Sequence, residues 1–218
     1  MSFTIIRYVG YTQHPFTASQ DAILYAAVLI SSCLGIIGAL LILITFVRIP
    51  ALQQSAVSRI VAAMAVADLV SSTCKAFGHS PSYISSPNGA ICQAQGALIQ
   101  WSDLSSVLWT MTISINLLAI MYLRQGVNSI QKFEYRYALL CYGLPAILAL
   151  IPLFVRGIQP NGEVISGYGD ATLYCWIPDA FTVIRALLYY IPMWLIFTIN
   201  LGAFLLVGRV VWRTDRAI

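Results

Sequence analysis

Four long apolar stretches without a charged residue constrain the fold of this chain more than any other feature. They cover residues 22–47, 104–123, 137–155 and 186–208. A helix rises 1.5 Å per residue, so about 20 residues cross the roughly 30 Å hydrocarbon core of a bilayer. Each stretch is therefore long enough, or within a residue of it, to form a membrane-spanning helix.

The composition excludes a water-soluble domain. Hydrophobic residues make up 59% of the chain and charged residues 9%, whereas about a quarter of a soluble domain is charged. The stretches lack the strict alternation of transmembrane β-strands. The net charge of +4 is small and scattered, which does not favour a nucleic acid partner. We expect the lipid bilayer to be the solvent.

A fifth apolar segment begins at Ile60 and is interrupted by Asp68 and Lys75. We therefore predict an all-α membrane protein with five transmembrane helices. The first 21 residues lack the apolar core of a signal peptide, so the first span is expected to direct insertion. The predicted organisation is an extracellular segment at 1–21, a helical bundle at 22–212 with spans at about 22–47, 57–77, 93–123, 137–155 and 183–208, and a cytoplasmic tail at 213–218.

The basic residues favour an extracellular N-terminus. That orientation places eight basic residues on the inner side and four on the outer side, and basic residues near span ends are retained in the cytoplasm. Cys92 and Cys175 then lie on the oxidising outer side, where a disulfide between them is one expectation. Free thiols and a Cys74–Cys92 bridge are the alternatives. In the outer loop, the runs EVIS and ATLYC flank a Gly-Tyr-Gly turn, which predicts a small β-hairpin.

Two carboxylates fall inside the predicted spans. Asp103 lies 11 residues after Cys92 and Asp68 nine after Arg59, which places them about 16 Å and 13 Å from opposite faces. An ionised Asp at such depth costs about 2.5–3.5 kcal/mol, so it is expected to face the protein interior and to mark a functional site. A hydrogen-bonded Asp that only holds helices together is the structural alternative.

Polar residues recur at helical spacing around this acid. Gln100, Asp103 and Ser106 are three residues apart and share one stripe, which indicates a hydrated inner face. We take Gln100, Trp101, Asp103 and Arg185 as the candidate ligand-binding set. Packing is the alternative for Trp101, and extension of the side chain to the lipid headgroups is the alternative for Arg185.

Span five contains Pro192, which cannot donate to the carbonyl of Leu188 and is expected to kink the helix beside this set. Pro145 and Pro152 are expected to act similarly in span four.

An enzyme is the function least favoured by the sequence. The two histidines, His14 and His79, lie outside the predicted spans, so we expect no metal site, no cofactor and no catalytic residue. A small transporter or channel is the alternative, because midplane acids such as Asp68 and Asp103 often couple to ions or protons. A receptor accounts better for the long outer loop over the bundle.

Several stretches carry a resemblance to a known family. They are AVADL at 65–69, CQAQGALIQWSDLSSVLWT at 92–110, YGLPAILALIPLF at 142–154, YCWI at 174–177 and ALLYYIPMWL at 186–195. In this order the chain resembles the first five helices of seven-helix G-protein-coupled receptors of the cAMP-receptor-like class, including fungal glucose-receptor-like proteins. MYLRQG stands where the rhodopsin-like class has its D/E-R-Y triplet.

The resemblance implies a plasma-membrane receptor that senses an extracellular polar small molecule, such as a nutrient or cyclic nucleotide, and signals through a heterotrimeric G protein. It also implies a Cys92–Cys175 disulfide and a polar-switch role for Asp68. The sequence ends after WRTDRAI, where spans six and seven of such a receptor would follow. We therefore expect this five-span chain not to signal by itself.

Overall fold

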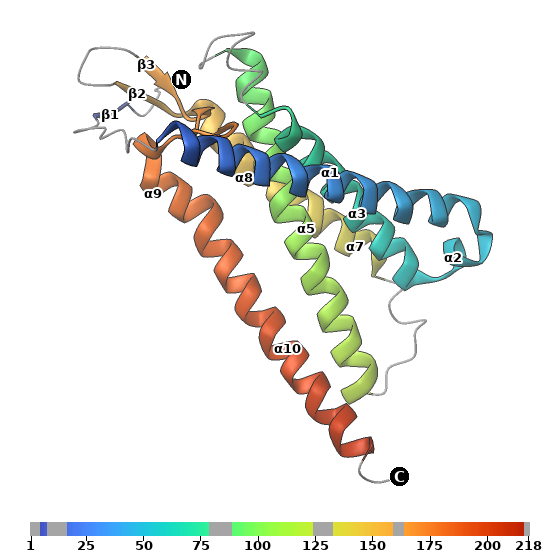
Figure 1. Cartoon of the computed structure of the whole chain (residues 1–218). Coiled ribbons are helices and arrows are strands. Elements are labelled where there is room, and N and C mark those ends of the chain that lie inside the picture. The colour runs from blue at the N-terminus through green and yellow to red at the C-terminus, as the bar shows by residue number, and fades with distance from the viewer. Residues whose placement is uncertain (1–4, 8–16, 79–88, 124–132, 159–163, 216–218) are drawn as a thin grey trace.

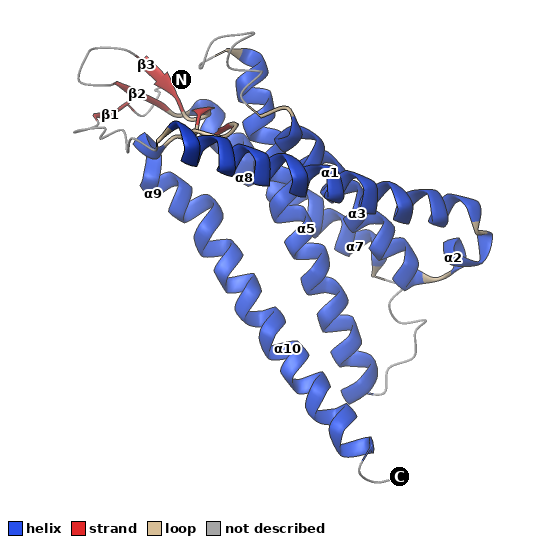
Figure 2. Ribbon diagram, in the orientation of Figure 1, coloured by secondary structure: helices blue, strands red, loops and turns tan. Residues whose placement is uncertain are grey.

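The computed structural model describes residues 5–7, 17–78, 89–123, 133–158 and 164–215. Within these ranges, five helical rods are long and apolar enough to cross a membrane, as Figures 1 and 2 show. The five predicted spans are thus confirmed in number and order. The rods are α1 (Ala18–Arg48), α3 (Ala56–Ala76), α5 (Ala90–Leu123), a fourth rod of α7 (Glu134–Ala138), η1 (Leu139–Gly143), α8 (Leu144–Leu150) and η2 (Ile151–Phe154), and a fifth of η3 (Asp179–Phe181), α9 (Thr182–Arg185), η4 (Ala186–Tyr190) and α10 (Ile191–Asp215).

The helix ends follow local sequence signals. Thr17 caps α1 in a capping box with Gln20, whose side-chain oxygen accepts from the Thr17 amide at 2.9 Å. This satisfies amide groups that the first helical turn leaves unpaired. At the other end of α1, a short helix α2 (Pro50–Gln54) begins with proline, which is favoured at a first helical position. Ser55 then caps α3 by accepting from the amide of Ser58.

Helix α5 is the axis of the bundle, because it contacts α3 on one side and α8 and α10 on others. Helix α1 lies outermost and packs mainly on α3. Buried hydroxyls on α5 are satisfied within the helix, since each donates to the carbonyl four residues earlier. These bonds pair the buried hydroxyls of this helix inside the membrane. The donors are Ser102, Ser105, Thr112 and Ser114.

A β-hairpin in the outer loop is confirmed, but the loop contributes to two small sheets and its paired strands are not the predicted ones. Strand β2 (Arg156–Ile158) pairs with β1 (Ile5–Arg7) and with β3 (Val164–Ser166), while β4 (Gly169–Asp170) pairs with β5 (Cys175–Trp176). The predicted partner runs, EVIS and ATLYC, therefore contribute strands to different sheets.

The strands before and after the predicted Gly-Tyr-Gly turn belong to different sheets, and Tyr168 in this turn is fully buried against Gly96 of α5. Its hydroxyl donates to the carbonyl of Ala149 at 2.9 Å. Gly167 lies tightly against the Pro152 carbonyl, where a side chain has no room. The turn therefore anchors the loop to the bundle, and the two strand pairs form on either side of it. We call residues 164–177 the lid.

Two π-helical turns interrupt spans four and five. They are η1 and η4, and each ends two residues before a proline, Pro145 or Pro192. Proline lacks the amide hydrogen that continues a helix, and π turns are a recognised accommodation inside helices. The irregularity in span five thus lies next to the residue that the sequence singled out.

Candidate ligand site beneath the lid

Asp103 faces the interior of the bundle and forms an ion pair with Lys75. The Lys75 Nζ lies 2.8 Å from Oδ1 and 2.9 Å from Oδ2 of the carboxylate. Ser71 donates to Oδ1, and the hydroxyl of Tyr189 lies 3.2 Å from Oδ2. The Asp103 side chain is 14% exposed and that of Lys75 is 26% exposed. The acid at the membrane interior is therefore compensated by a cation and two hydroxyls from α3 and η4.

A second carboxylate–serine contact lies deeper between the same two helices. Ser106 of α5 donates to Asp68 of α3 at 2.5 Å. The two contacts are reciprocal, since α3 supplies Ser71 to Asp103 while α5 supplies Ser106 to Asp68. The spacing of three residues on each helix places both contacts on one face. Two serine–carboxylate hydrogen bonds therefore join helices α3 and α5 inside the membrane.

Aromatic residues cover the ion pair from the lid side. Trp176 of β5 packs edge-to-face on Tyr189, with ring centroids 4.8 Å apart, and on Tyr190 at 6.2 Å. The guanidinium of Arg185 lies 5.0 Å from the Trp176 ring centroid, within cation–π range. Tyr189 also contacts Asp103, so it connects Trp176 of the lid to the ion pair.

Arg185 and Trp101 have structural partners. Arg185 forms an ion pair with Asp179 at 2.6 Å and donates to the carbonyl of Ile177. Its charge thus holds the start of span five to the lid, which neither sequence interpretation had specified. Trp101 donates from Nε1 to the carbonyl of Tyr142 at 3.0 Å and stacks on that ring. This is the packing role that the sequence analysis gave as its alternative.

Gln100, another member of the predicted set, is fully buried and joins the lid to span five. Its Oε1 accepts from Trp176 Nε1 at 2.9 Å, and its Nε2 donates to the carbonyl of Leu188 at 2.9 Å. Leu188 precedes Pro192 by four residues, so its carbonyl lacks the usual α-helical donor. The Gln100 amide supplies a donor in its place.

Gln95 has a similar role that the sequence analysis missed. Its Nε2 donates to the carbonyls of Cys74 and Gly78, and its Oε1 accepts from the amide of Cys175. The two glutamines thus bind the lid to α5 at both ends of β5. Lys75, Ser71 and Tyr189 were also missed. The spacing of Asp68, Ser71 and Lys75 on one helical face was the available signal for two of them.

The Cys92–Cys175 disulfide is present, with Cα atoms 5.3 Å apart. Cys74 is free, so the alternative Cys74–Cys92 bridge is excluded. The disulfide links β5 to the first turn of α5 and fixes the lid over the bundle. Burial in the lid raises the pKa of the Tyr168 and Tyr174 phenols above their ordinary value, because an apolar setting disfavours the charged phenolate.

The described residues contain no cluster of three or more His, Cys, Asp or Glu side chains that could hold a metal ion. The groups beneath the lid are instead a cation, carboxylates and hydroxyls, together with aromatic rings. Together, five apolar rods and a disulfide-linked lid over a partly buried ion pair define a multi-pass helical membrane protein.

Comparison with known proteins gives the family. Residues 16–218 match the family model described as slime mold cyclic AMP receptor, and the chain belongs to this family. It is 29% identical over 192 residues to cyclic AMP receptor-like protein A of Dictyostelium discoideum, covering 88% of this chain and 47% of that protein. Cyclic AMP receptor 2 of the same organism is 30% identical over 77% of this chain and 42% of its own length.

The match to cyclic AMP receptor 1 of Dictyostelium discoideum is 28% identical and covers 76% of this chain and 39% of that receptor. The chain thus spans less than half the length of these curated relatives. The predicted resemblance to cAMP receptors is confirmed, whereas the resemblance to fungal glucose-receptor-like proteins finds no support in these matches.

Proposed function

We propose that this chain binds an extracellular polar small molecule beneath the lid, and that in a complete receptor this binding is passed to a heterotrimeric G protein. The observation that carries the proposal is the partly exposed Lys75–Asp103 pair under a disulfide-linked lid. The oxidised lid supports an extracellular position for that end of the bundle. We accordingly assign the N-terminus to the outside and the protein to the plasma membrane.

The chemistry beneath the lid favours an anionic ligand with a flat ring. Lys75 offers a cation for a phosphate or carboxylate, and it is the more exposed member of its pair. Trp176 and Tyr189 offer aromatic surface beside it. A cyclic nucleotide combines a phosphodiester anion with a planar base, whereas glucose has neither. The relatives named as cyclic AMP receptors support the same choice.

The contacts suggest how binding is transmitted. A ligand anion that binds Lys75 competes with Asp103 for the ammonium group. Asp103 also contacts Tyr189, which lies within the π turn η4 of span five. Release of this contact would alter span five, while the deeper Asp68–Ser106 contact would respond through α3. In this proposal Asp68 acts as the polar switch.

Binding of radiolabelled cyclic AMP to membranes that contain the chain tests the site. We expect Lys75→Gln to weaken binding by about tenfold to a hundredfold, the equivalent of a charge-assisted hydrogen bond of about 1.5–3 kcal/mol. Asp103→Asn is expected to change affinity as well, because it removes the competing anion. The matched control is Arg59→Gln, which breaks the Arg59–Glu134 ion pair at the opposite end of α3.

Equal losses in Lys75→Gln and Arg59→Gln would place the ligand elsewhere, as would unchanged binding in a folded Lys75→Gln variant. Coupling to a G protein is tested separately with a reporter in cells. We expect a ligand-dependent response in a complete receptor that carries these residues, and Lys75→Gln should abolish that response. Liposomes containing the purified chain are expected to show no ion or proton flux, and a flux that is lost in Asp68→Asn would favour the transporter alternative.

A further inference from the structure

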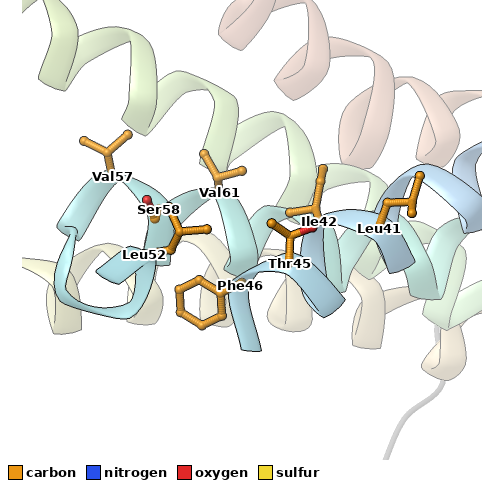
Figure 3. Close-up of a pocket in the computed structure, with 8 residues that line it drawn as sticks. All are labelled: Leu41, Ile42, Thr45, Phe46, Leu52, Val57, Ser58 and Val61. Carbon is orange, nitrogen blue, oxygen red and sulfur yellow. The ribbon is translucent and has the colours of Figure 1, made fainter. Parts of the chain in front are cut away.

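An apolar groove lies between α1, α2 and α3 (Figure 3). Figure 1 shows α2, and hence this groove, at the end of the bundle remote from the lid. Its volume is about 350 Å³, which is at the lower end of the range for small-molecule sites. Figure 3 shows side chains from α1 and α3 along its length and Leu52 of α2 beside them. The lining residues are Leu41, Ile42, Thr45, Phe46, Leu52, Val57, Ser58 and Val61.

The groove lies at the depth where acyl chains meet headgroups. Helix α1 has 31 residues and is therefore about 46 Å long, which exceeds the roughly 30 Å hydrocarbon core and reaches the interface. The groove occupies the last two turns before Arg48, the final residue of α1. Leu41 and Val57, on its two walls, are 60% and 42% exposed. The groove is thus open to the membrane.

A cation stands at the interfacial end of the groove. Leu41, Thr45 and Arg48 are spaced by four and three residues, which places them on one face of α1. Arg48 is exposed, and no carboxylate among the described residues forms an ion pair with it. The neighbouring Arg59, by contrast, is held by Glu134 at 2.7 Å. Arg48 is therefore available to an anion at headgroup depth.

We propose that this groove is a binding site for an anionic glycerophospholipid, with one acyl chain between α1 and α3 and the phosphate held by Arg48. The apolar lining selects a hydrocarbon chain, and the two hydroxyls of Thr45 and Ser58 are its polar exceptions. A basic residue near a membrane surface attracts anionic lipid. The cytoplasmic leaflet carries such lipids, and the lid at the other end lies on the oxidised side.

The test uses the full chain in detergent, with phosphatidylglycerol and phosphatidylcholine of identical acyl chains. Native mass spectrometry measures the lipid retained, and a photoreactive acyl chain locates the site. We expect retention of one phosphatidylglycerol in preference to phosphatidylcholine, with crosslinks to residues of the groove. Arg48→Gln should weaken retention about fivefold, the equivalent of about 1 kcal/mol for one basic residue near an anionic surface.

Matched controls separate this site from general membrane contact. Arg209→Gln removes an exposed cation on α10, and it should leave retention unchanged. Val61→Trp fills the groove and should abolish preferential retention, whereas Val66→Trp, on an exposed part of α3 outside the groove, should not. The helical circular dichroism of each variant shows whether it has folded.

Three results would overturn the proposal. They are equal retention of the two lipids, equal effects of the Arg48 and Arg209 substitutions, and crosslinks distributed along all of α1. The two arginine variants change only an exposed side chain, so the comparison of their lipid retention tests the proposal even if Val61→Trp fails to fold.

Discussion

Gln100→Leu provides a sharp test of how the lid is attached to span five. The substitution keeps the size and apolar stem of the side chain but removes both polar atoms. The indole Nε1 of Trp176 then loses its acceptor, and the carbonyl of Leu188 loses its donor. Trp176 is 8% exposed and residue 100 is fully buried, so water cannot easily replace either partner.

The expected cost follows from these two bonds. Hydrogen bonds between side chains inside membrane proteins contribute about 0.6 kcal/mol on average and up to about 1.7 kcal/mol. Loss of two such bonds should lower the free energy of unfolding by about 1–3 kcal/mol. The Leu188 half of the loss depends on Pro192, because a residue with an amide hydrogen at that position could donate to the Leu188 carbonyl.

Pro192→Ala should therefore rescue part of the Gln100→Leu defect. The assay is reversible unfolding in mixed micelles, followed by circular dichroism, for the two single variants and the double variant. We expect Gln100→Leu to cost about 1 kcal/mol less in the Pro192→Ala background, since the new backbone amide at position 192 then serves the carbonyl. The matched control is Gln95→Leu, which breaks bonds to α3 and the lid but none to span five.

An identical cost of Gln100→Leu in both backgrounds would refute this reasoning. So would an equal rescue of Gln95→Leu by Pro192→Ala. Either outcome would mean that the Leu188 carbonyl does not depend on the glutamine, and that the irregular turn in span five is maintained by other contacts.

Three further predictions concern the lid. Cys175→Ser should lower stability by at most about 4–5 kcal/mol, the chain-entropy value for a disulfide that closes a separation of 83 residues; thermal scans with and without reductant should then coincide for the variant. Gly96→Ala should cost about 1–3 kcal/mol, because its Cβ would lie 2.6 Å from Tyr168 Cδ1. Gly202→Ala, inside α10, meets open space and should be neutral or slightly stabilising, since alanine has the higher helix propensity; denaturant midpoints compare the two. Burial raises the pKa of Tyr168, so the contribution of Tyr168 to stability should be complete below about pH 10 and decline above it. The absorbance of its tyrosinate should therefore appear only when the protein unfolds. Titration of Tyr168 in the folded protein would contradict this.

The spans were predictable because membrane insertion leaves a strong one-dimensional signal. Each uncharged stretch of about 20 residues must be helical to satisfy its backbone in lipid, so residues 22–47 and 137–155 indicated helices without any knowledge of packing. The inward orientation of Asp103 followed from the free-energy cost of exposing an ionised carboxylate to lipid. The disulfide followed in part from compartment chemistry and from the family resemblance.

The partners of these residues were less accessible. In the sequence, Lys75 is visible only as a charge that interrupts an apolar segment, although it is the counter-ion of Asp103 on another helix. A stripe of polar residues does not reveal whether it faces a ligand or another part of the chain, and Gln100 contacts the lid and span five. Tyr168, at the predicted turn of the hairpin, is buried against Gly96, a tertiary contact that the local sequence does not reveal.

The wide turn η4 in span five has a mechanical consequence. A π turn holds one residue more than an α turn, so the sequence before and after it is offset by about 100° around the helix axis. If the π turn shifted by one residue along the helix, one side chain would change its direction around the helix axis. The helix on either side of the turn would stay in place. Tyr189 lies inside the turn, which makes it the residue that such a slip would carry away from Asp103.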